Sequence, residues 1–563
     1  MAYVITQSCC NDAGCVSECP VDCIRPAPGQ PDFATAEMLY IDPGTCIDCG
    51  ACVPACPVGA IFAEEDLTAP LRRYAEINAT YFQSNPLDAD ISAPLPAAPS
   101  LPRGHDTLRV AVVGSGPAAA YATRALLSNA EVTVDLFEKL PTPGGLVRAG
   151  IAPDHQRTKA IGDRFEADRA RQTLAYHLNV TVGEHIQPAE LLEYHHAVIY
   201  AIGAAADREL GIEGERLPGS HSATEFVGWY NGHPDYADHA FDLCAERAVV
   251  IGNGNVALDL ARILTIDPAE LATTDIADHA LAALRHSKIR EVVVLGRRSP
   301  AQAAYTGPEL LALSQLRGVD VRVNPRDLRL DATEAAAVQA DPAQRLKWSL
   351  ACDYARADAA GDRRRITLRF LSTPVALRGT NSVQALEYAR NTLRRRDGAV
   401  IAEPTDTIET IETSLVLRSI GYRGLAIPGV PFDRHRGVIP NDHGRVLDHG
   451  DVVPGAYVAG WIKRGPHGVI GTNRADAEET VAALFADFGA GRLATPPRGR
   501  AELTQLLAHR QPDLIDGSGW RAIDSAERAE GRANGRPRVK LTDHAALLAA
   551  ANSTRTTAGR GLP

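Results

Sequence analysis

A run of four cysteines closed by a proline constrains this chain more than any other feature. It reads Cys46-x2-Cys49-x2-Cys52-x3-Cys56-Pro57. At this spacing three close thiolates wrap one iron–sulfur cluster and the fourth ligates a neighbouring cluster. A disulfide framework and a zinc site are the alternatives. Disulfides are rare in cytoplasmic chains, which we expect this one to be, and zinc sites usually pair two CxxC units across a longer gap. The run therefore predicts an iron–sulfur domain.

An upstream run has the same spacing but lacks one cysteine. It reads Cys9-x2-Asp12-x2-Cys15-x3-Cys19-Pro20. Exchanging the fourth cysteines between the runs predicts one 4Fe-4S cluster, and its ligands are Cys19, Cys46, Cys49 and Cys52. The other cluster is assigned to Cys9, Cys15 and Cys56, with Asp12 as a candidate fourth ligand. Because carboxylate is a harder and weaker ligand than thiolate, we expect 3Fe-4S, or 4Fe-4S with a labile corner. Cys10 and Cys23 are alternative ligands, although a buried position near a cluster suits both better.

The cysteine-rich head, residues 1–65, differs from the remainder in composition. It holds nine of the eleven cysteines, nine acidic residues and one basic residue, for a net charge of −8. The whole chain carries −11. We therefore expect the head to be a separate unit that docks on basic residues of the remainder. Residues 66–106 include a Pro/Ala-rich stretch and predict a linker, whose segment LRRYAEINATYF favours a short helix.

A glycine turn after an apolar strand indicates a first dinucleotide site. The strand LRVAVV leads into Gly114-Ser-Gly116-Pro-Ala-Ala119, which opens a helical run. The glycines let the backbone approach a pyrophosphate at the helix N-terminus. An acid should follow roughly 20 residues later to bind ribose hydroxyls, and Glu138 stands 24 residues after Gly114. A ribose with a free 2′-hydroxyl, as in FAD, is expected here.

A second turn of the same kind follows the strand RAVVI. Its residues are Gly252, Asn253, Gly254 and Asn255. The next strand, EVVVLG, ends in Arg297 and Arg298 rather than in an acid. Guanidinium groups at that place suit a ribose 2′-phosphate; the alternative is a solvated arginine pair on a loop. Two turns imply two dinucleotides, and we assign FAD to the first turn and NADP(H) to the second.

A third glycine loop lies near the end of the chain. It runs from Trp461 through Gly468, Val469 and Ile470 into a helix. Backbone N–H groups at a helix start favour negative charge, and reduced flavin carries negative charge on its pyrimidine edge. We expect this loop to seat the flavin ring; read alone, it is a turn before a helix.

Together these motifs resemble the adrenodoxin reductase-like ferredoxin–NADP reductases. The matching segments are VVGSGPA, LPTPGGLVRAGIAPDH, VVIGNGNVALDLARIL, VVVLGRR and AGWIKRGPHGVIGTN. The resemblance spans residues 107–563. With the head, which resembles two-cluster ferredoxins including the seven-iron type, the whole chain is similar to fusions of a ferredoxin with such a reductase.

The resemblance implies an α/β fold. Two Rossmann-like dinucleotide-binding domains of glutathione-reductase-like topology should follow a small α+β ferredoxin domain, with the NADP domain inserted into the FAD domain. The implied domains are 1–65 (two-cluster ferredoxin), 66–106 (linker), 107–247 (FAD, first part), 248–415 (NADP) and 416–563 (FAD, second part, with a helical tail).

The resemblance also implies site residues by matching position. The FAD residues are Gly114, Gly116, Ala118, Ala119, Glu138, Leu146, Val182, Trp461, Gly468, Val469 and Ile470. The NADP residues are Arg208, Gly252, Asn253, Gly254, Asn255, Arg297, Arg298, Glu309 and Gly468. His155 and Glu309 are the candidate catalytic residues; the alternative for His155 is a structural hydrogen bond. Pro308, directly before Glu309, departs from the family pattern but suits a first helical turn.

The function predicted from these features is that of an NADPH-dependent flavoprotein ferredoxin reductase, an oxidoreductase of electron transport. Hydride would pass from NADPH to FAD, and single electrons would pass to the fused head and on to an external acceptor, such as a ferredoxin or a cytochrome P450. Two alternatives are a reductase subunit of a glutamate-synthase-like system and a non-catalytic flavin and iron–sulfur redox sensor. No motif specifies the acceptor, the direction of flow or the oligomeric state.

Charge and hydropathy exclude other function classes. A net charge of −11 disfavours a duplex nucleic-acid binder. No apolar run approaches the ~18 residues of a membrane helix, and the N-terminus lacks the pattern of a secretory signal. We expect a cytoplasmic protein with neither nucleic-acid nor membrane partners.

Overall fold

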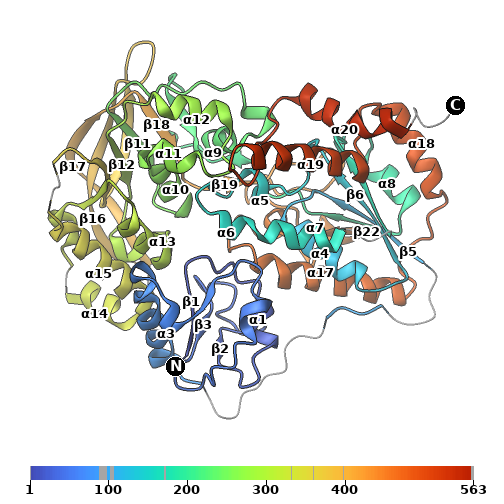
Figure 1. The fold of residues 1–563 in the computed structure, drawn as a ribbon, viewed down its shortest axis with the longest axis horizontal. Helices are drawn as coiled ribbons and strands as arrows, with labels where there is room; N and C mark the ends of the chain where they lie inside the picture. The colour runs from blue at the N-terminus through green and yellow to red at the C-terminus, as the bar shows by residue number, and fades with distance from the viewer. Residues whose placement is uncertain are drawn as a thin grey trace.

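The structure of the protein is a computed structural model that describes residues 2–87, 98–101, 107–169, 173–330, 332–358, 361–396 and 399–558. The stretches 88–97 and 102–106 of the predicted linker lie outside the described residues. Within the described part of the chain, no helix combines the length and apolar character needed to cross a membrane. The chain forms two large sheets and a small cysteine-rich head beside them (Figure 1).

Seven strands form the first sheet, in the order β20-β21-β22-β8-β5-β6-β7. The five strands from β22 to β7 run parallel, and they are apolar because helices cover the sheet. The strand bounds are β5 (Leu108–Val113), β6 (Val132–Glu138), β7 (Leu174–Leu178), β8 (Ala197–Tyr200), β20 (Asn441–Asp442), β21 (Arg445–Asp448) and β22 (Asp451–Val458). Helices α4 (Pro117–Leu127) and α17 (Thr472–Gly489) share one apolar core with β5 and β6.

The second large sheet has six parallel strands in the order β10-β18-β11-β12-β14-β13. Their bounds are β10 (Ser220–Ser222), β11 (Arg247–Ile251), β12 (Glu291–Leu295), β13 (Val319–Val323), β14 (Arg364–Arg369) and β18 (Leu415–Arg418). An antiparallel sheet of β15 (Ser372–Arg378), β16 (Ala385–Arg396) and β17 (Ala399–Glu412) accompanies it. The helices of this second large unit are α9 (Ala223–Asn231), α10 (Asn255–Thr265), α11 (Pro268–Leu271), α12 (Asp278–Arg285), α13 (Gly307–Ala312), α14 (Ala332–Ala340) and α15 (Pro342–Arg356).

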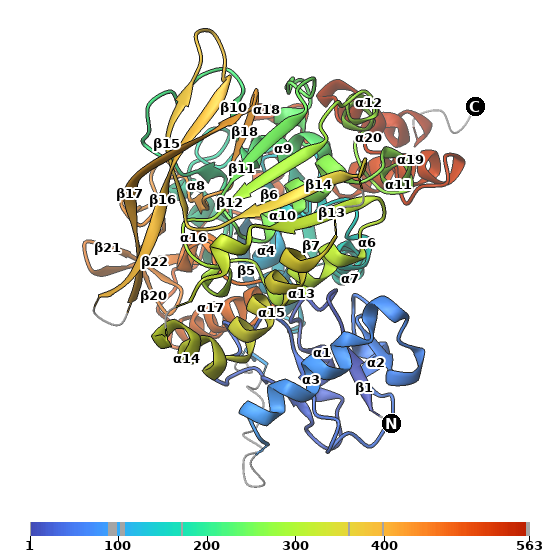
Figure 2. The ribbon, with the colours of Figure 1, turned by 90° about the vertical axis from the view of Figure 1, so that its left-hand side faces the viewer.

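The two sheets interleave along the chain. The first sheet is left after β8, the second is built from β10 to β18, and the chain then returns to the first sheet at β20 (Figure 2). A short pair, β9 (Ala206–Asp207) with β19 (Tyr422–Arg423), joins the outgoing and returning segments. The predicted α/β fold with one Rossmann-like unit inserted into the other is confirmed. The exact limits of the functional domains stay a prediction.

Smaller helices complete the first unit. They are α5 (Leu146–Ala149), α6 (Gln156–Lys159), α7 (Ile161–Arg169), α8 (Pro188–Tyr194) and α16 (Trp461–Arg464), followed by α18 (Arg500–Arg510), α19 (Gly517–Ala533) and α20 (His544–Ala558) near the C-terminus. The buried carboxylate of Glu527 attaches α19 to α5. The two terminal guanidinium nitrogens of Arg148 on α5 donate to it, at 2.6 and 2.9 Å.

The head consists of two strand pairs and short helices. β1 (Tyr3–Ile5) pairs with β4 (Ile61–Ala63), and β2 (Ile24–Arg25) pairs with β3 (Tyr40–Ile41), both antiparallel. Helices α1 (Gly14–Ser17) and α2 (Cys52–Ala55) follow cysteine-containing loops. The short helix expected after the head is confirmed as α3 (Arg73–Ser84).

One buried side chain attaches α3 to the head. Asn78 accepts hydrogen bonds from the backbone N–H groups of Ile5 (3.3 Å) and Ile41 (2.9 Å), and it donates to the Ile5 carbonyl (2.9 Å). The amide therefore satisfies backbone groups of two strands that do not pair with each other. Helix α3 is part of the folded head rather than a free spacer.

Replacing Asn78 by Ala should unfold the head before the remainder. The substitution leaves two buried N–H groups without partners, which costs about 2–4 kcal/mol of unfolding free energy. In a thermal ramp of the full chain, the visible absorbance of bound iron should be lost at a lower temperature while flavin release stays unchanged. Asn85→Ala is the control, because exposed Asn85 bonds only within its own helix end. Equal shifts in both transitions would contradict the assignment.

Candidate functional site

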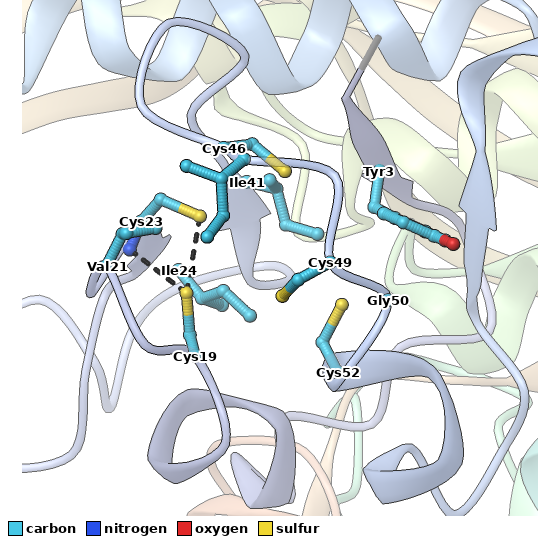
Figure 3. Close-up of a pocket in the computed structure, with 11 residues that line it drawn as sticks. Tyr3, Cys19, Val21, Cys23, Ile24, Ile41, Cys46, Cys49, Gly50 and Cys52 are labelled. Atoms are coloured by element: carbon cyan, nitrogen blue, oxygen red, sulfur yellow. Dashed lines mark hydrogen bonds between the residues drawn. The ribbon is translucent and has the colours of Figure 1, made fainter.

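The first predicted ligand set lines one pocket of the head. Figure 3 shows the sulfur atoms of Cys19, Cys46, Cys49 and Cys52 gathered around a common space, which Ile24 and Ile41 border. These cysteines come from the two ends of the head, so the exchange of fourth cysteines brings distant segments together. All eleven cysteines are free thiols. Four convergent thiols without a disulfide fit a soft metal centre.

Cys23 also lines this pocket, as a fifth cysteine. Its sulfur is 3.4 Å from that of Cys19, and its backbone N–H donates to the Cys19 sulfur, also at 3.4 Å. Cys56 receives the corresponding hydrogen bond from the N–H of Ala60, at 3.2 Å. The fourth cysteine of each run thus accepts from the residue four positions later, as expected for sulfur atoms in equivalent environments.

Cys9, Cys15 and Cys56 form the second group. Burial raises the pKa of the Cys9 thiol to about 11, and the nearby Cys56 adds to this effect. Burial also raises the pKa of Cys15 well above its ordinary value, with contributions from Cys9 and Cys56. Each thiol is within electrostatic reach of the others. Three neighbouring thiols without a disulfide fit a soft metal centre as well.

Asp12, the candidate fourth ligand, contacts the first large unit. The hydroxyl of Tyr121 on α4 donates to its Oδ1 at 2.6 Å. Its Oδ2 lies 3.7 Å from an Arg164 nitrogen and 3.9 Å from an Arg474 nitrogen. Only 1 % of the Asp12 side chain is exposed. The expected ligand role of Asp12 stays a prediction.

The first glycine turn has the geometry that a dinucleotide needs. Gly114 has φ +103°, and a Cβ there would lie 2.5 Å from the Ala201 carbonyl oxygen. Ser115 donates to the Glu138 carboxylate at 2.6 Å and accepts from the Gly144 N–H. Burial raises the pKa of Glu138, although hydrogen bonds from Ser115 and Leu140 oppose the rise. A buried carboxylate at the end of β6 fits ribose hydroxyls.

The predicted flavin loop lies against the same turn. A Cβ on Gly460, directly before Trp461, would lie 2.5 Å from the Ala118 side chain on α4. The Trp461 ring stacks on Tyr422 at 5.6 Å. Its indole nitrogen is buried and has no hydrogen-bond partner among the described residues. An unpartnered buried donor in this place fits a bound cofactor.

The other predicted FAD residues lie on separate elements. Ala118 and Ala119 are buried on α4, Val182 is buried after β7, and Leu146 on α5 is 41 % exposed. Gly468 has φ +82° and precedes Val469, whose N–H donates to Thr472 at the start of α17. Leu146 and Gly468 are the exposed members of this set.

The second glycine turn is tied to helix α13. Gly252 has φ +114°, and a Cβ there would overlap the Ser419 carbonyl. Asn255 accepts from the Thr306 N–H at 2.8 Å, and the Asn253 carbonyl accepts from the Tyr305 N–H at 2.9 Å. The turn therefore fixes the segment that leads into α13, and Glu309 lies on that helix.

The predicted phosphate-binding arginines lie side by side after β12. Arg297 is exposed and Arg298 is half-buried. Burial and the charge of Arg297 both lower the pKa of Arg298. Neither guanidinium forms a salt bridge with an acid among the described residues, so the pair fits an anion. Arg208 is exposed beside Gly421, at the segment that returns from the second sheet.

His155 and Glu309 meet at a buried arginine that sequence reasoning missed. Arg262 on α10 is 2 % exposed and donates to Asp154 (2.8 Å), Asp259 (2.6 Å) and Glu309 (3.2 Å). It also donates to His155 Nε2 at 2.7 Å. Because arginine has no acceptor, this contact makes Nε2 the acceptor and leaves the His155 proton on Nδ1. The missed signal is the charge of Arg262 within the apolar run VALDLARIL.

The head contacts both large units. In the second unit, Glu37 accepts from the Gly307 N–H at 2.7 Å and pairs with Lys347 at 2.7 Å. Gln7 donates to Glu309 at 3.2 Å. In the first unit, the Cys10 carbonyl accepts from the Gly471 N–H at 2.7 Å. The expected docking of the acidic head on basic residues is confirmed at Asp12 and Glu37.

Family models match two parts of the chain. A 4Fe-4S binding domain matches residues 39–62, which include Cys46 to Cys56. A pyridine nucleotide-disulphide oxidoreductase model matches residues 108–326, which include both glycine turns.

Relatives match the chain over its length. A protein of Mycobacterium tuberculosis named as a probable ferredoxin/ferredoxin–NADP reductase is 50% identical, over 98% of this chain and 95% of its own. The NADPH-ferredoxin reductase FprA of the same organism is 47% identical over 78% of this chain and 98% of its own. A solved structure of FprA in complex with NADPH has a TM-score of 0.75, with 46% sequence identity, and covers 79% of this chain and 99% of that chain.

Removing the charge of Arg262 should destabilise the chain in a pH-dependent way. Burial alone would raise the pKa of Asp154, but the charge of Arg262, together with His155 and the hydrogen bonds that Asp154 accepts, outweighs burial and holds this pKa at about 2. Asp154 therefore contributes stability above its unfolded pKa, and this stability is lost only as pH falls through about 2. Arg262→Met leaves carboxylates buried without a cation, which costs about 3–5 kcal/mol at pH 7.

The loss should be smaller at pH 5 than at pH 8, because the stranded carboxyl groups then take up protons in the folded state. Denaturant unfolding of the full chain at both pH values measures it. The control is Arg285→Met, since Arg285 is exposed on α12. An Arg262→Met deficit that is equal at both pH values would show that charge burial is not its cause.

Proposed function

This chain belongs to the ferredoxin/ferredoxin–NADP reductase family, and on that premise we propose that it oxidises NADPH and delivers the electrons singly, through its own head, to an external acceptor. One contact carries the proposal. The Cys10 carbonyl, adjacent to the thiol residue Cys9, accepts a hydrogen bond from Gly471, adjacent to the loop residue Ile470. This contact supports a short route between the flavin loop and the metal-binding head.

We assign FAD to the first glycine turn. Bound FAD accepts a hydride and releases its electrons one at a time, which is chemistry that no side chain supplies. Gly114 and Gly116 would leave room for the pyrophosphate, and Glu138 would accept hydrogen bonds from the ribose hydroxyls. The unpartnered indole N–H of Trp461 supports a place for the ring system. The other residues of this assignment are Ala118, Ala119, Leu146, Val182, Gly468, Val469 and Ile470.

The second glycine turn is assigned to NADP(H). Arg297 and Arg298 form no salt bridge with an acid among the described residues, and a 2′-phosphate would neutralise both. The other residues of this assignment are Arg208, Gly252, Asn253, Gly254, Asn255, Glu309 and Gly468.

His155 and Glu309 are assigned to the place where the two cofactors meet. Arg262 donates to both side chains, to Glu309 at 3.2 Å and to His155 Nε2 at 2.7 Å. With Nε2 used as an acceptor, His155 offers its Nδ1–H as a hydrogen-bond donor. This role depends on the orientation of His155, which Arg262 fixes.

The head is assigned two iron–sulfur clusters. Cys19, Cys46, Cys49 and Cys52 would hold a 4Fe-4S cluster, and Cys9, Cys15 and Cys56 the second. The roles above are assigned to the five predicted domains, whose limits are residues 65, 106, 247 and 415. Free thiols throughout the chain favour a cytoplasmic site of action. A ferredoxin or a cytochrome P450 is the proposed class of external acceptor.

Low-temperature EPR of anaerobically purified protein tests the proposal. Addition of NADPH should bleach the flavin absorbance, and signals of reduced clusters should appear in the same sample. Flavin that bleaches while the head stays oxidised would refute electron transfer into the head. A full-length chain with the double substitution Cys46→Ser/Cys52→Ser serves as the control, because it loses two thiols of one pocket and retains the nucleotide turns.

The arginine pair should determine the preference for NADPH over NADH. Charge-assisted hydrogen bonds contribute about 1.5–3 kcal/mol each, and about 1.4 kcal/mol corresponds to a factor of ten, so Arg297→Ala/Arg298→Ala should raise KM for NADPH by about 100-fold or more. KM for NADH should change little, because NADH lacks the 2′-phosphate. Steady-state ferricyanide reduction measures both constants. The exposed Arg317, which pairs with Glu270, provides the control Arg317→Ala. An equal loss with both nucleotides would contradict the assignment.

A further inference from the structure

The residue that replaces a cysteine in the first run takes part in a buried contact between the head and the flavin-binding unit. Three side chains from three helices surround the Asp12 carboxylate: Tyr121 on α4, Arg164 on α7 and Arg474 on α17. The Tyr121 hydroxyl donates at 2.6 Å, and one nitrogen of each arginine lies within 4 Å. A buried carboxylate needs a hydrogen bond and a neighbouring cation. Oδ1 has the hydrogen bond, and Oδ2 has the two cations but accepts no hydrogen bond from the described residues.

The backbone around Asp12 presents the same face to the flavin-binding unit. Arg474 donates to the Asp12 carbonyl at 2.9 Å, and Gly471 donates to the Cys10 carbonyl at 2.7 Å. Gly471 has an ordinary helical backbone, yet a Cβ there would overlap the Asn11 carbonyl group. The segment from Cys10 to Asp12 therefore lies directly on the N-terminus of α17.

The local backbone turns sharply on both sides of Asp12. Asn11 has φ +57° and Ala13 has φ +58°, so left-handed residues bracket the carboxylate. The left-handed conformation is unfavourable for alanine. The contacts between the head and the flavin-binding unit compensate for this cost. Cys9 and Cys15 lie within the head, one on each side of this segment.

We propose that Asp12 is a positioning residue that docks the head on the flavin-binding unit, and that it is not an iron ligand. The site of Cys9, Cys15 and Cys56 then has three protein ligands and is the site that faces the flavin loop. The inference rests on the proposed function, because it assigns a route for the electrons of that reaction. It explains why this position of the run carries a carboxylate, since a cysteine thiol would pair poorly with two guanidinium groups and a phenol.

The step concerned is a one-electron transfer. Flavin reduced by NADPH loses one electron, and the three-thiolate centre gains it. No covalent bond forms between the two parts. Asp12 takes no part in this exchange of electrons; it fixes the separation and orientation of the donor and the acceptor.

Three variants of the full chain test the inference: Asp12→Ala, Asp12→Asn and Tyr121→Phe. Each is compared with Glu65→Gln, which removes one charge from an exposed position of the same acidic head. Iron content and the EPR spectrum of the oxidised protein report ligation. Anaerobic stopped-flow with NADPH reports the rate of flavin bleaching and, separately, the rate of head reduction.

Iron content and EPR line shape should match the unsubstituted chain in all variants. The ratio of the head-reduction rate to the flavin-bleaching rate should fall on the order of tenfold in Asp12→Ala and less in Tyr121→Phe and Asp12→Asn, because each retains part of the contact set. In Glu65→Gln the ratio should stay within twofold. Added salt should lower the ratio further in the Asp12 variants. The buried charge of Asp12 is absent from them, and salt screens the more exposed charges that remain.

The opposite pattern would overturn the inference. Iron loss or a changed EPR spectrum in both Asp12 variants, with an unchanged ratio in Tyr121→Phe, would make Asp12 a ligand. If Asp12→Ala fails to fold, Tyr121→Phe decides alone, because it leaves every thiol and the carboxylate in place; an unchanged ratio there refutes the docking role. Failure of the proposed function is distinct, since the unsubstituted chain would then bleach without reducing its head.

Discussion

The position of the head depends on one close contact, in which the backbone of residues 10–12 lies on Gly471 at the start of α17. A side chain at position 471 would displace the head, because its Cβ would occupy the space of the Asn11 carbonyl. The contact places a segment between two predicted thiol ligands beside the loop assigned to the flavin. The rate of electron transfer between two fixed centres depends on their separation. This backbone contact fixes the separation between the head and the loop assigned to the flavin.

Buried charges hold the remaining contacts of the head in place. Glu37 receives the Gly307 N–H and pairs with Lys347, while Asp12 lies near Arg164 and Arg474. Each pair joins the acidic head to a different large unit, so the head spans both. Gln7 reaches Glu309 in the same way, and Glu309 shares Arg262 with His155. The head therefore borders the residues assigned to the nucleotides as well as those assigned to the flavin.

Features that depend on local spacing could be predicted from the sequence, and features that depend on distant packing could not. Both glycine turns and the strand–turn–helix units that contain them follow from patterns a few residues long, whereas the insertion of one unit into the other is implied by the resemblance to a known family. The gathering of Cys19 with Cys46, Cys49 and Cys52 follows from the exchange between two runs. The partners of Asp12 had no such pattern, because Tyr121, Arg164 and Arg474 are spread over 353 positions of the chain. Arg262 left one faint signal, a charge on the apolar face of α10, but three of its four partners, Asp154, His155 and Glu309, lie outside that helix.

The central claim is that electrons from NADPH enter the head of the same molecule. Anaerobic stopped-flow with excess NADPH, repeated over a tenfold or greater range of protein concentration, tests it most directly. If electrons pass within one molecule, the rate of head reduction should be first order and independent of protein concentration. A rate that rises in proportion to protein concentration would mean that electrons pass between molecules, and it would contradict the docked arrangement as the working state.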